Sequence, residues 1–325
     1  MAATVLFAPL HAAGVILLCL ARVAGHAEHW LVDSLSYGLP ILLLLSVLHL
    51  PGAIWRRSPY LLSATAIPLV VFGLFYGSSY VPRPPSDDVA PSFTVMSYNV
   101  WGGNNNYDRI VEAIEEKAAD VVGLQEITDR IADEIQGDLA DRYPYQAIDG
   151  DQAVFSRYPI VGHEVLLIGD QRAPITVQHI DLDLNGTQIG IVNVHTHSPQ
   201  LMASRLMGLR LGYPSGFVNR WRDLEVRELM KAIEKMEGPL VVLGDFNLTE
   251  LQAVYGELTG VLRDAHKEAG YGLGLTRTPL RGLGPPLWRI DFVFHSSDLV
   301  ALGTDFGAFG GSDHRPVVAE LAFRD

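Results

Sequence analysis

The chain has 325 residues, 48% of them hydrophobic, which is enough to form one large domain or two with buried cores. Its formal net charge of −13 argues against a protein that binds duplex DNA through a basic face. The only cysteine, Cys19, excludes a disulfide within the chain, a cysteine-based metal site and a cysteine nucleophile outside the first apolar segment.

The first 82 residues contain three apolar segments. Residues 37–55 and 58–82 carry no formal charge, and each is long enough to cross a bilayer as a helix. Residues 4–21 are a third candidate, for which a cleaved signal peptide is the alternative, although no basic region precedes it. A buried helical hairpin is the alternative for the other two. We expect residues 1–80 to form a membrane anchor with about three transmembrane helices.

Basic residues in the short loops predict the orientation of this anchor. Arg56 and Arg57 lie between the second and third segments without any acid, which places that loop in the cytoplasm. The loop before it carries Arg22 together with Glu28 and Asp33. The N-terminus is then inside, and everything after residue 82 lies outside the cytoplasm.

Residues 81–92 (VPRPPSDDVAPS) are rich in proline and polar side chains and are predicted to be a linker. Residues 1–92 carry four basic and four acidic side chains. The whole net charge therefore belongs to residues 93–325, which carry 20 basic and 33 acidic residues.

Apolar strand patterns alternate with amphipathic helix patterns in residues 93–325, which predicts sheets covered by helices in an α/β or α+β sandwich. The Asn185-Gly186 pair predicts a hairpin turn, and Gly238 predicts the end of a helix. The expected strands are residues 93–101, 121–126, 152–157, 176–184, 187–196, 239–243, 289–296 and 314–323, and the expected helices are residues 107–120 and 221–238.

The segment PLVVLGDFNLTE, residues 239–250, changes from apolar to polar within one step. Gly244 lets the chain turn sharply or approach a ligand closely. Asp245 and Asn247 are two residues apart and face the same side of an extended chain. A strand followed by an Asx turn is the structural alternative to a functional site.

Polar residues that could bind a metal recur where apolar strands end or begin. The motifs SYNVW, LQE, NVH, GDFN, RIDFVF and SDHRP occur in that order. Together they resemble the endonuclease/exonuclease/phosphatase superfamily over residues 93–325. That superfamily includes deoxyribonuclease I, abasic-site endonucleases, inositol-polyphosphate 5-phosphatases and neutral sphingomyelinases. The resemblance implies a four-layered αββα sandwich of the α+β class, with the active site at one end of two packed sheets.

Oxygen ligands without sulfur select a hard cation, so we expect Mg²⁺, with Mn²⁺ as a possible substitute. Glu126 is the strongest candidate ligand, with Asn99 beside it and Asp313 as a further acid. The alternatives are that Glu126 caps the next helix and that Asn99 is a turn residue.

His314 can change its protonation state near neutral pH. The resemblance assigns Asp291 as the carboxylate that orients it, which gives a pair able to take a proton from water. It also places Asn247 as a donor to a phosphoryl oxygen and Asp245 in positioning water or a proton.

His195 matches the position that contacts phosphate or protonates the leaving group in related enzymes, and His197 is a competing candidate. Trp101 departs from the pattern of the abasic-site enzymes, which carry an acid at this position. This departure weakens an assignment of the chain to the DNA-repair branch.

Two windows depart from the acidic trend, residues 199–222 and 269–290, because they contain arginines and no acid. We expect them to form a basic, partly apolar collar at the rim of the site that binds an anionic group. A solvated helix face is the alternative for the first window. The arginines concerned are Arg205, Arg210, Arg220 and Arg222 in the first window and Arg277, Arg281 and Arg289 in the second, of which Arg205, Arg210, Arg277 and Arg281 are predicted to bind substrate.

The sequence therefore predicts a membrane-anchored, Mg²⁺-dependent phosphodiesterase or phosphatase. A short linker keeps the site near the bilayer, where lipid phosphates are concentrated, so a lipid-linked or small phosphate ester is the expected substrate. No protein partner can be inferred. A nuclease acting on DNA outside the cytoplasm and an inactive scaffold with the same fold are the alternatives.

Overall fold

The computed structural model describes residues 2–26, 29–82, 92–206, 209–279 and 284–324. These residues form two compact units. One unit contains residues 1–82, 200–218 and 251–253, and the other contains the rest of the chain. Most of the predicted linker, residues 83–91, lies outside the described residues.

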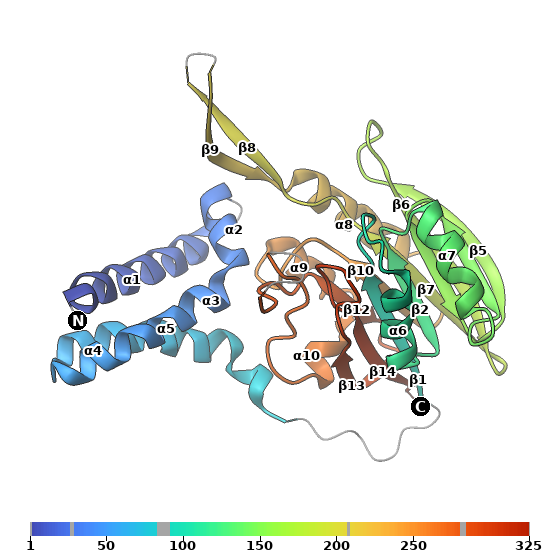
Figure 1. Cartoon of the computed structure of the whole chain (residues 1–325), viewed down its shortest axis with the longest axis horizontal. Coiled ribbons are helices and arrows are strands. Elements are labelled where there is room, and N and C mark those ends of the chain that lie inside the picture. The colour runs from blue at the N-terminus through green and yellow to red at the C-terminus, as the bar shows by residue number, and fades with distance from the viewer. Residues whose placement is uncertain (1, 27–28, 83–91, 207–208, 280–283, 325) are drawn as a thin grey trace. The chain divides into compact units, whose positions relative to one another are not determined.

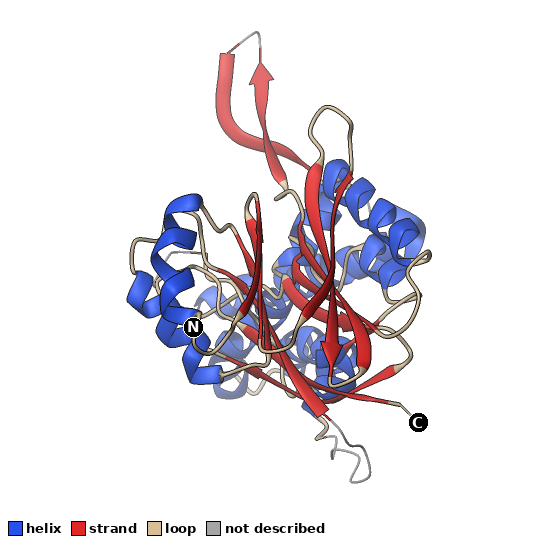
Figure 2. Ribbon diagram, turned by 90° about the vertical axis from the view of Figure 1, so that its right-hand side faces the viewer, coloured by secondary structure: helices blue, strands red, loops and turns tan. Residues whose placement is uncertain are grey.

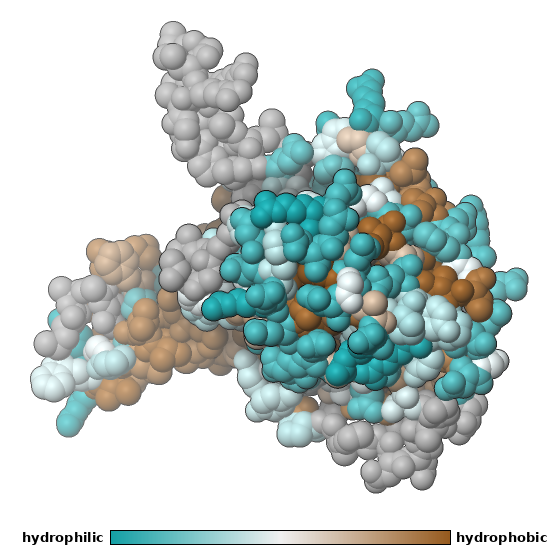
Figure 3. Space-filling model, turned by 45° about the vertical axis from the view of Figure 1, so that its right-hand side comes forward, coloured by the Kyte–Doolittle hydropathy of each residue, from teal (hydrophilic) through white to brown (hydrophobic). Residues whose placement is uncertain are grey.

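Two helices of the first unit are long and apolar enough to cross a membrane, Val5–His26 and Pro59–Tyr80. Figure 3 shows hydrophobic residues gathered over the N-terminal helices, and Leu17 and Leu74 are among the exposed ones. A third span is possible if the helix pair Trp30–Tyr37 and Leu39–Trp55, bent by 70°, counts as one, and the predicted middle span, residues 37–55, lies almost wholly in its second part. Prolines begin two of its short helices, and proline lacks the amide N–H that a continuous helix needs. The helices are α1 (Ala2–Ala21), α2 (Trp30–Tyr37), α3 (Leu39–Leu44), α4 (Leu50–Trp55) and α5 (Pro59–Tyr76).

A long hairpin, β8 (Gln200–Leu206) and β9 (Leu209–Val218), belongs to the same unit. For residues 200–218 of the first arginine window the helical alternative is therefore wrong, whereas Arg220 and Arg222 of that window do lie on a helix, Arg220–Ile233. Glycine and proline recur in the sequence LGYPSG and disfavour a helix interior, whereas they are tolerated where the two strands pair irregularly.

The second unit is a four-layered αββα sandwich, as the motifs imply. Figure 2 shows its two sheets packed against each other, with helices on the outer faces. Each sheet has six strands. The first has the order β13 (Leu299–Phe306), β14 (Val317–Phe323), β1 (Ser92–Asn99), β2 (Val121–Gln125), β4 (Gln152–Ser156), β3 (Tyr145–Asp149), and the second β11 (Arg263–Asp264), β12 (Asp291–His295), β10 (Leu240–Asp245), β7 (Thr187–His195), β6 (Ile175–Leu184), β5 (Ile160–Ile168).

Three apolar clusters fill the three interfaces between these layers. The alternation of β1 explains how one strand serves two of them: Phe93 and Val95 lie in the core between the sheets, whereas Met96 and Tyr98 pack under helices. The helices are α6 (Tyr107–Lys117), α7 (Asp129–Leu139), α8 (Arg220–Ile233), α9 (Ala253–Leu258) and α10 (Ala265–Ala269) (Figure 1).

Candidate active site

Four strands bring polar side chains to one end of the space between the sheets: Asn99 ends β1, His195 ends β7, Asp245 ends β10 and Asp291 begins β12. In each strand the residue two or four positions away belongs to the core between the sheets. The alternation of a strand therefore directs all four side chains into that space. Asp245 pairs in register with His195 on one side and with Asp291 on the other.

Gly244 is required by its backbone conformation. Its φ of +151° disfavours other residues, and a Cβ there would lie 1.8 Å from the carbonyl oxygen of Val194. The next residues form the expected Asx turn, because the Asn247 N–H donates to Asp245 Oδ1 at 2.9 Å. The turn therefore holds the Asp245 carboxylate in the site. The segment fits both the Asx-turn alternative and a functional site, because the turn positions the functional side chain.

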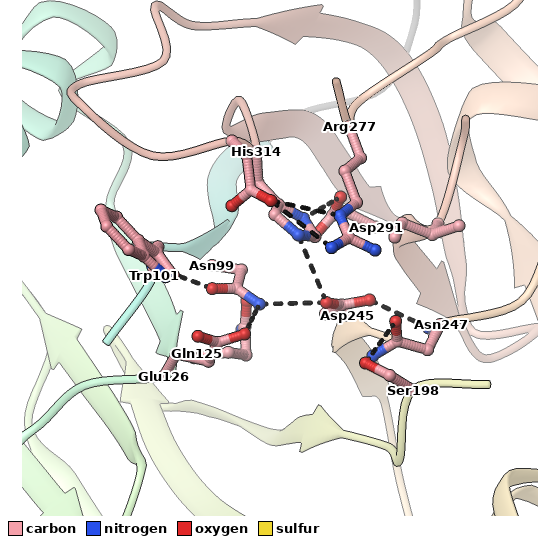
Figure 4. Close-up of polar contacts among 12 residues, drawn as sticks. Asn99, Trp101, Gln125, Glu126, Ser198, Asp245, Asn247, Arg277, Asp291 and His314 are labelled. Atoms are coloured by element: carbon pink, nitrogen blue, oxygen red, sulfur yellow. Dashed lines mark hydrogen bonds and ion pairs between the residues drawn. The ribbon is translucent and has the colours of Figure 1, made fainter. Parts of the chain in front are cut away.

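Asn99 joins the two sheets at this point (Figure 4). Its Nδ2 donates to Glu126 Oε1 and to Asp245 Oδ2, both at 3.0 Å. The other Glu126 oxygen accepts from the Gly102 N–H at 3.1 Å. Burial alone would raise the pKa of Glu126, but the hydrogen bonds from Asn99 and Gly102 and the nearby His195 lower it, so this group is held as a carboxylate.

His314 is buried against two carboxylates. Its Nδ1 lies 2.9 Å and 3.0 Å from the Asp291 oxygens, and its Nε2 lies 3.7 Å from Asp245 Oδ2. Burial alone would lower the pKa of His314, but Asp291 and Asp245 outweigh it and raise that pKa to about 9. Conversely, burial and the neighbouring Asp291 raise the pKa of Asp245. Two buried acids therefore share one imidazole here, and a second negative charge is disfavoured unless a cation neutralises it.

His195 lies between two acids, with Nδ1 at 2.9 Å from Asp151 Oδ2 and Nε2 at 3.8 Å from Glu126 Oε1. Burial alone would lower the pKa of His195, but the bond to Asp151 and the charges of Asp245 and Glu126 raise it. Asp151 is not among the site residues that the sequence predicts. Its only signal was an acid in the turn after Gly150, between β3 and β4.

Asp313 is mostly buried, and Arg277 donates to its Oδ2 at 3.4 Å from both Nε and a terminal nitrogen. Arg277 also forms a backbone bridge to His314, which places it at the edge of the site. Arg281 lies outside the described residues. Arg205 and Arg210 pair across β8 and β9, in a hairpin whose backbone alone is described.

Two members of the predicted arginine collar are not available for an external anion. Arg222 is buried, pairs with Asp223 and donates to the Asn247 carbonyl at 3.1 Å. Arg289 is buried and pairs with Asp264 at 2.5 Å. The collar prediction is wrong for both, because each is buried against an acid, Arg222 against the adjacent Asp223 and Arg289 against Asp264 of β11.

The site contains the donors that a divalent cation needs. Asp245, Asp291 and His314 each offer a ligand atom, and these atoms lie within 4.8 Å of one another. Glu126 adds a carboxylate that Asn99 links to Asp245. Oxygen donors and uncompensated negative charge fit a hard cation such as Mg²⁺.

A family model described as "Endonuclease/Exonuclease/phosphatase family" matches residues 96–314. The sequence matches no curated protein.

Several solved structures share the fold. A mannosyl-6-phosphatase from Bacteroides thetaiotaomicron is 20% identical with a TM-score of 0.55, and the match covers 71% of this chain and 100% of that one. Sphingomyelinase C from Streptomyces griseocarneus is 20% identical with a TM-score of 0.52, covering 71% and 99%. Truncated TDP2 from Caenorhabditis elegans is 17% identical with a TM-score of 0.55, covering 74% and 100%.

Proposed function

Because the chain belongs to the endonuclease/exonuclease/phosphatase family, whose members hydrolyse phosphate esters, we propose that it is a membrane-anchored, Mg²⁺-dependent phosphodiesterase or phosphatase. The observation that carries the proposal is that a candidate metal ligand, a carboxylate able to position water and a histidine–carboxylate pair meet at Asp245. Asn99 links Glu126 to Asp245, and the His314–Asp291 pair lies against the same Asp245.

Glu126, Asn99 and Asp313 would hold the cation, and the buried cluster of Asp245 and Asp291 adds negative charge that favours it. A bound cation would neutralise negative charge on the phosphoryl oxygens. The donor set, oxygen-rich and without sulfur, supports Mg²⁺, with Mn²⁺ as the substitute.

The protein side chains divide the remaining work. A cation bound beside Asp245 and Asp291 would offset the charges that hold a proton on His314 in the metal-free chain. His314, held by Asp291, can then take a proton from the attacking water, and Asp245 orients that water. Asn247 donates to a phosphoryl oxygen, for which the Asx turn holds it in place. His195, fixed by Asp151, contacts the phosphate from the neighbouring strand.

A lipid-linked or small phosphate ester is the substrate that charge and tethering favour. The catalytic part carries the whole net charge of −13, and the burial of Arg222 and Arg289 removes two cations from any surface for DNA. Two helices able to cross a membrane would hold the site near lipid headgroups, and Arg56 and Arg57 favour the side outside the cytoplasm.

The test is a panel of phosphate esters offered to the full chain in detergent and in liposomes, with Mg²⁺ or with EDTA. We expect hydrolysis with Mg²⁺, loss with EDTA, and loss in Glu126→Ala but not in the exposed control Glu134→Ala. Release of phosphorylated headgroups from liposomes would support the lipid substrate, whereas nicking of supercoiled plasmid would support the nuclease. Activity in Glu126→Ala equal to that of the wild type would contradict the mechanism.

A further inference from the structure

The two sheets of the sandwich end unevenly along one edge. There β3 is the last strand of the first sheet and β5 the last strand of the second. The strand β3 covers the inner face of β6, because Gln178 Nε2 of β6 donates to the Ala147 carbonyl of β3 at 3.3 Å and to Asp149 Oδ2 at 2.6 Å. The inner face of β5, which continues that of β6, therefore extends past the first sheet.

The side chains on this overhanging face are apolar and yet exposed. Val165 and Leu167 pair in register with Gln178 and Thr176 of β6, so they lie on the inner face, and they are 42% and 69% exposed. Two further exposed apolar residues lie beside them, one at a bulge in β5 and one on the inner face of β3. We call these four residues the apolar edge: Val161, Val165 and Leu167 of β5 and Tyr145 of β3.

The outer face of β5 has the opposite character. Leu166 and Ile168 are covered there by apolar residues of α8, and Glu164, which is not covered, is charged. An edge strand with exposed apolar side chains invites association, and a contiguous apolar patch on a soluble unit marks an interaction site. Figure 3 shows hydrophobic residues among hydrophilic ones on this side of the second unit.

One end of the apolar edge lies near the active site. Leu167 pairs with Thr176, and the Thr176 carbonyl accepts a hydrogen bond from Gln152 Nε2 at 2.9 Å. Gln152 directly follows Asp151, the acid that fixes His195. A surface that binds the apolar edge would therefore lie beside the candidate active site.

The chain itself supplies a partner of the right chemistry. The second apolar helix ends at Tyr80, and residues 81–91, which separate it from β1, span at most about 40 Å when fully extended. A bilayer that holds this helix is thus always within reach, so even a weak apolar contact is made at high local concentration. The four side chains carry no charge, which suits contact with lipid by a unit whose net charge of −13 repels an anionic surface.

We propose that the apolar edge lies on the surface of the bilayer that holds the anchor, with Val165 and Leu167 at the boundary between headgroups and acyl chains. This contact orients the second unit, so that the end carrying Asp151 and His195 lies beside lipid-linked phosphates. The inference rests on the membrane anchor of the proposed function and does not depend on the reaction.

The test uses the full chain with Cys19→Ser, which leaves one cysteine to be introduced at a chosen position. An environment-sensitive fluorophore is attached at Leu167→Cys, Glu164→Cys or Leu74→Cys, in phosphatidylcholine vesicles that contain a lipid with a nitroxide high on its acyl chain. Side chains at the interface reach about 5–10 Å into the bilayer, so we expect the nitroxide to quench about half or more of the fluorescence at Leu167 and Leu74 and little at Glu164.

A second comparison separates docking from general exposure. Val165→Glu should abolish the quenching at Leu167, because a charge at the interface opposes insertion. Val261→Glu is the matched control and should preserve the quenching, since Val261 is also 42% exposed and lies outside the apolar edge.

Quenching at Leu74 without quenching at Leu167 would overturn the inference, as would equal quenching at Leu167 and Glu164. A disulfide between two Leu167→Cys chains in detergent, without quenching by lipid, would identify a second copy as the partner and would also overturn it. If Leu74 is not quenched, the membrane anchor of the proposed function fails, and this inference fails with it. Failure of the chain to hydrolyse any phosphate ester would leave the result at Leu167 unchanged.

Discussion

Replacing Asp291 with asparagine tests the electrostatics of the site in the metal-free protein. The raised pKa of His314 means that the folded chain holds a proton on this imidazole up to a pH of about 9, whereas the unfolded chain loses it near 6.5. The resulting stabilisation is complete below pH 6.5 and is lost as the pH rises through 9. At about 1.4 kcal/mol per pKa unit, a difference of roughly 2.5 units corresponds to about 3 kcal/mol.

The His314 side chain is 3% exposed, so solvent does not screen this interaction. The amide introduced by Asp291→Asn would still accept a hydrogen bond from His314 Nδ1 but would carry no charge. Between pH 6 and pH 9.5 the unfolding free energy of the wild type should fall by about 3 kcal/mol. The fall in the variant should be smaller by at least about 2 kcal/mol. The assay is urea unfolding followed by tryptophan fluorescence, in detergent and EDTA, across that pH range. Parallel curves of unfolding free energy against pH would refute the assignment of Asp291 as the main partner of His314.

Two further predictions concern the backbone and the rim of the site. Gly244→Ala should destabilise the chain by more than about 3 kcal/mol, because the added Cβ would overlap the Val194 carbonyl. Gly256→Ala in α9 is the control and should be neutral or slightly stabilising, because nothing lies within 4 Å of its added Cβ. Urea unfolding of both variants distinguishes a local clash at Gly244 from a general sensitivity to replacing glycine. Arg277→Ala should raise KM for an anionic ester by about three- to tenfold, the net worth of one hydrogen bond of about 0.7–1.4 kcal/mol, while the exposed control Arg142→Ala leaves KM unchanged. Steady-state kinetics that give the same KM for both variants would exclude Arg277 from substrate binding.

The strand ends of the site could be predicted from the sequence because they depend on local rules. Apolar alternation shows which side of a strand faces the core, and a polar residue continuing that alternation must enter the same space. This holds for Asn99 and Asp245, which lie 146 residues apart and yet share a hydrogen bond of 3.0 Å.

The partners of these residues could not be predicted in the same way. Asp151 reaches His195 from a hairpin turn and Glu225 reaches His197 from a helix, so only the packing of whole elements brings them together. The collar prediction was wrong for the buried Arg289 for a related reason. A count of charges within a window ignores acids elsewhere, and Arg289 is neutralised by Asp264, 25 residues away.

Strained backbone conformations at the site indicate that the packed sheets, rather than the loops themselves, determine the geometry of the active site. Among the described residues, six non-glycine residues have positive φ, and Arg57, Ala118 and Asn185 occupy helix ends or a hairpin turn, where this is common. The other three are at the site: Trp101 at +61°, Glu126 at +55° and Asn247 at +48°.

Backbone hydrogen bonds tie these strained residues to the side chains of the site: Trp101 and Asn247 donate through their own N–H groups, and the Glu126 side chain accepts the N–H of Gly102. The Trp101 N–H donates to Asn99, the Gly102 N–H to Glu126 and the Asn247 N–H to Asp245. Such conformations cost about 1–3 kcal/mol each and persist only when the surroundings stabilise them. Since the neighbouring Asp291 disfavours the charged form of Asp245, a cation that neutralises these acids would stabilise the strained loops as well. Metal binding and the ordering of this end of the sandwich should therefore be one process.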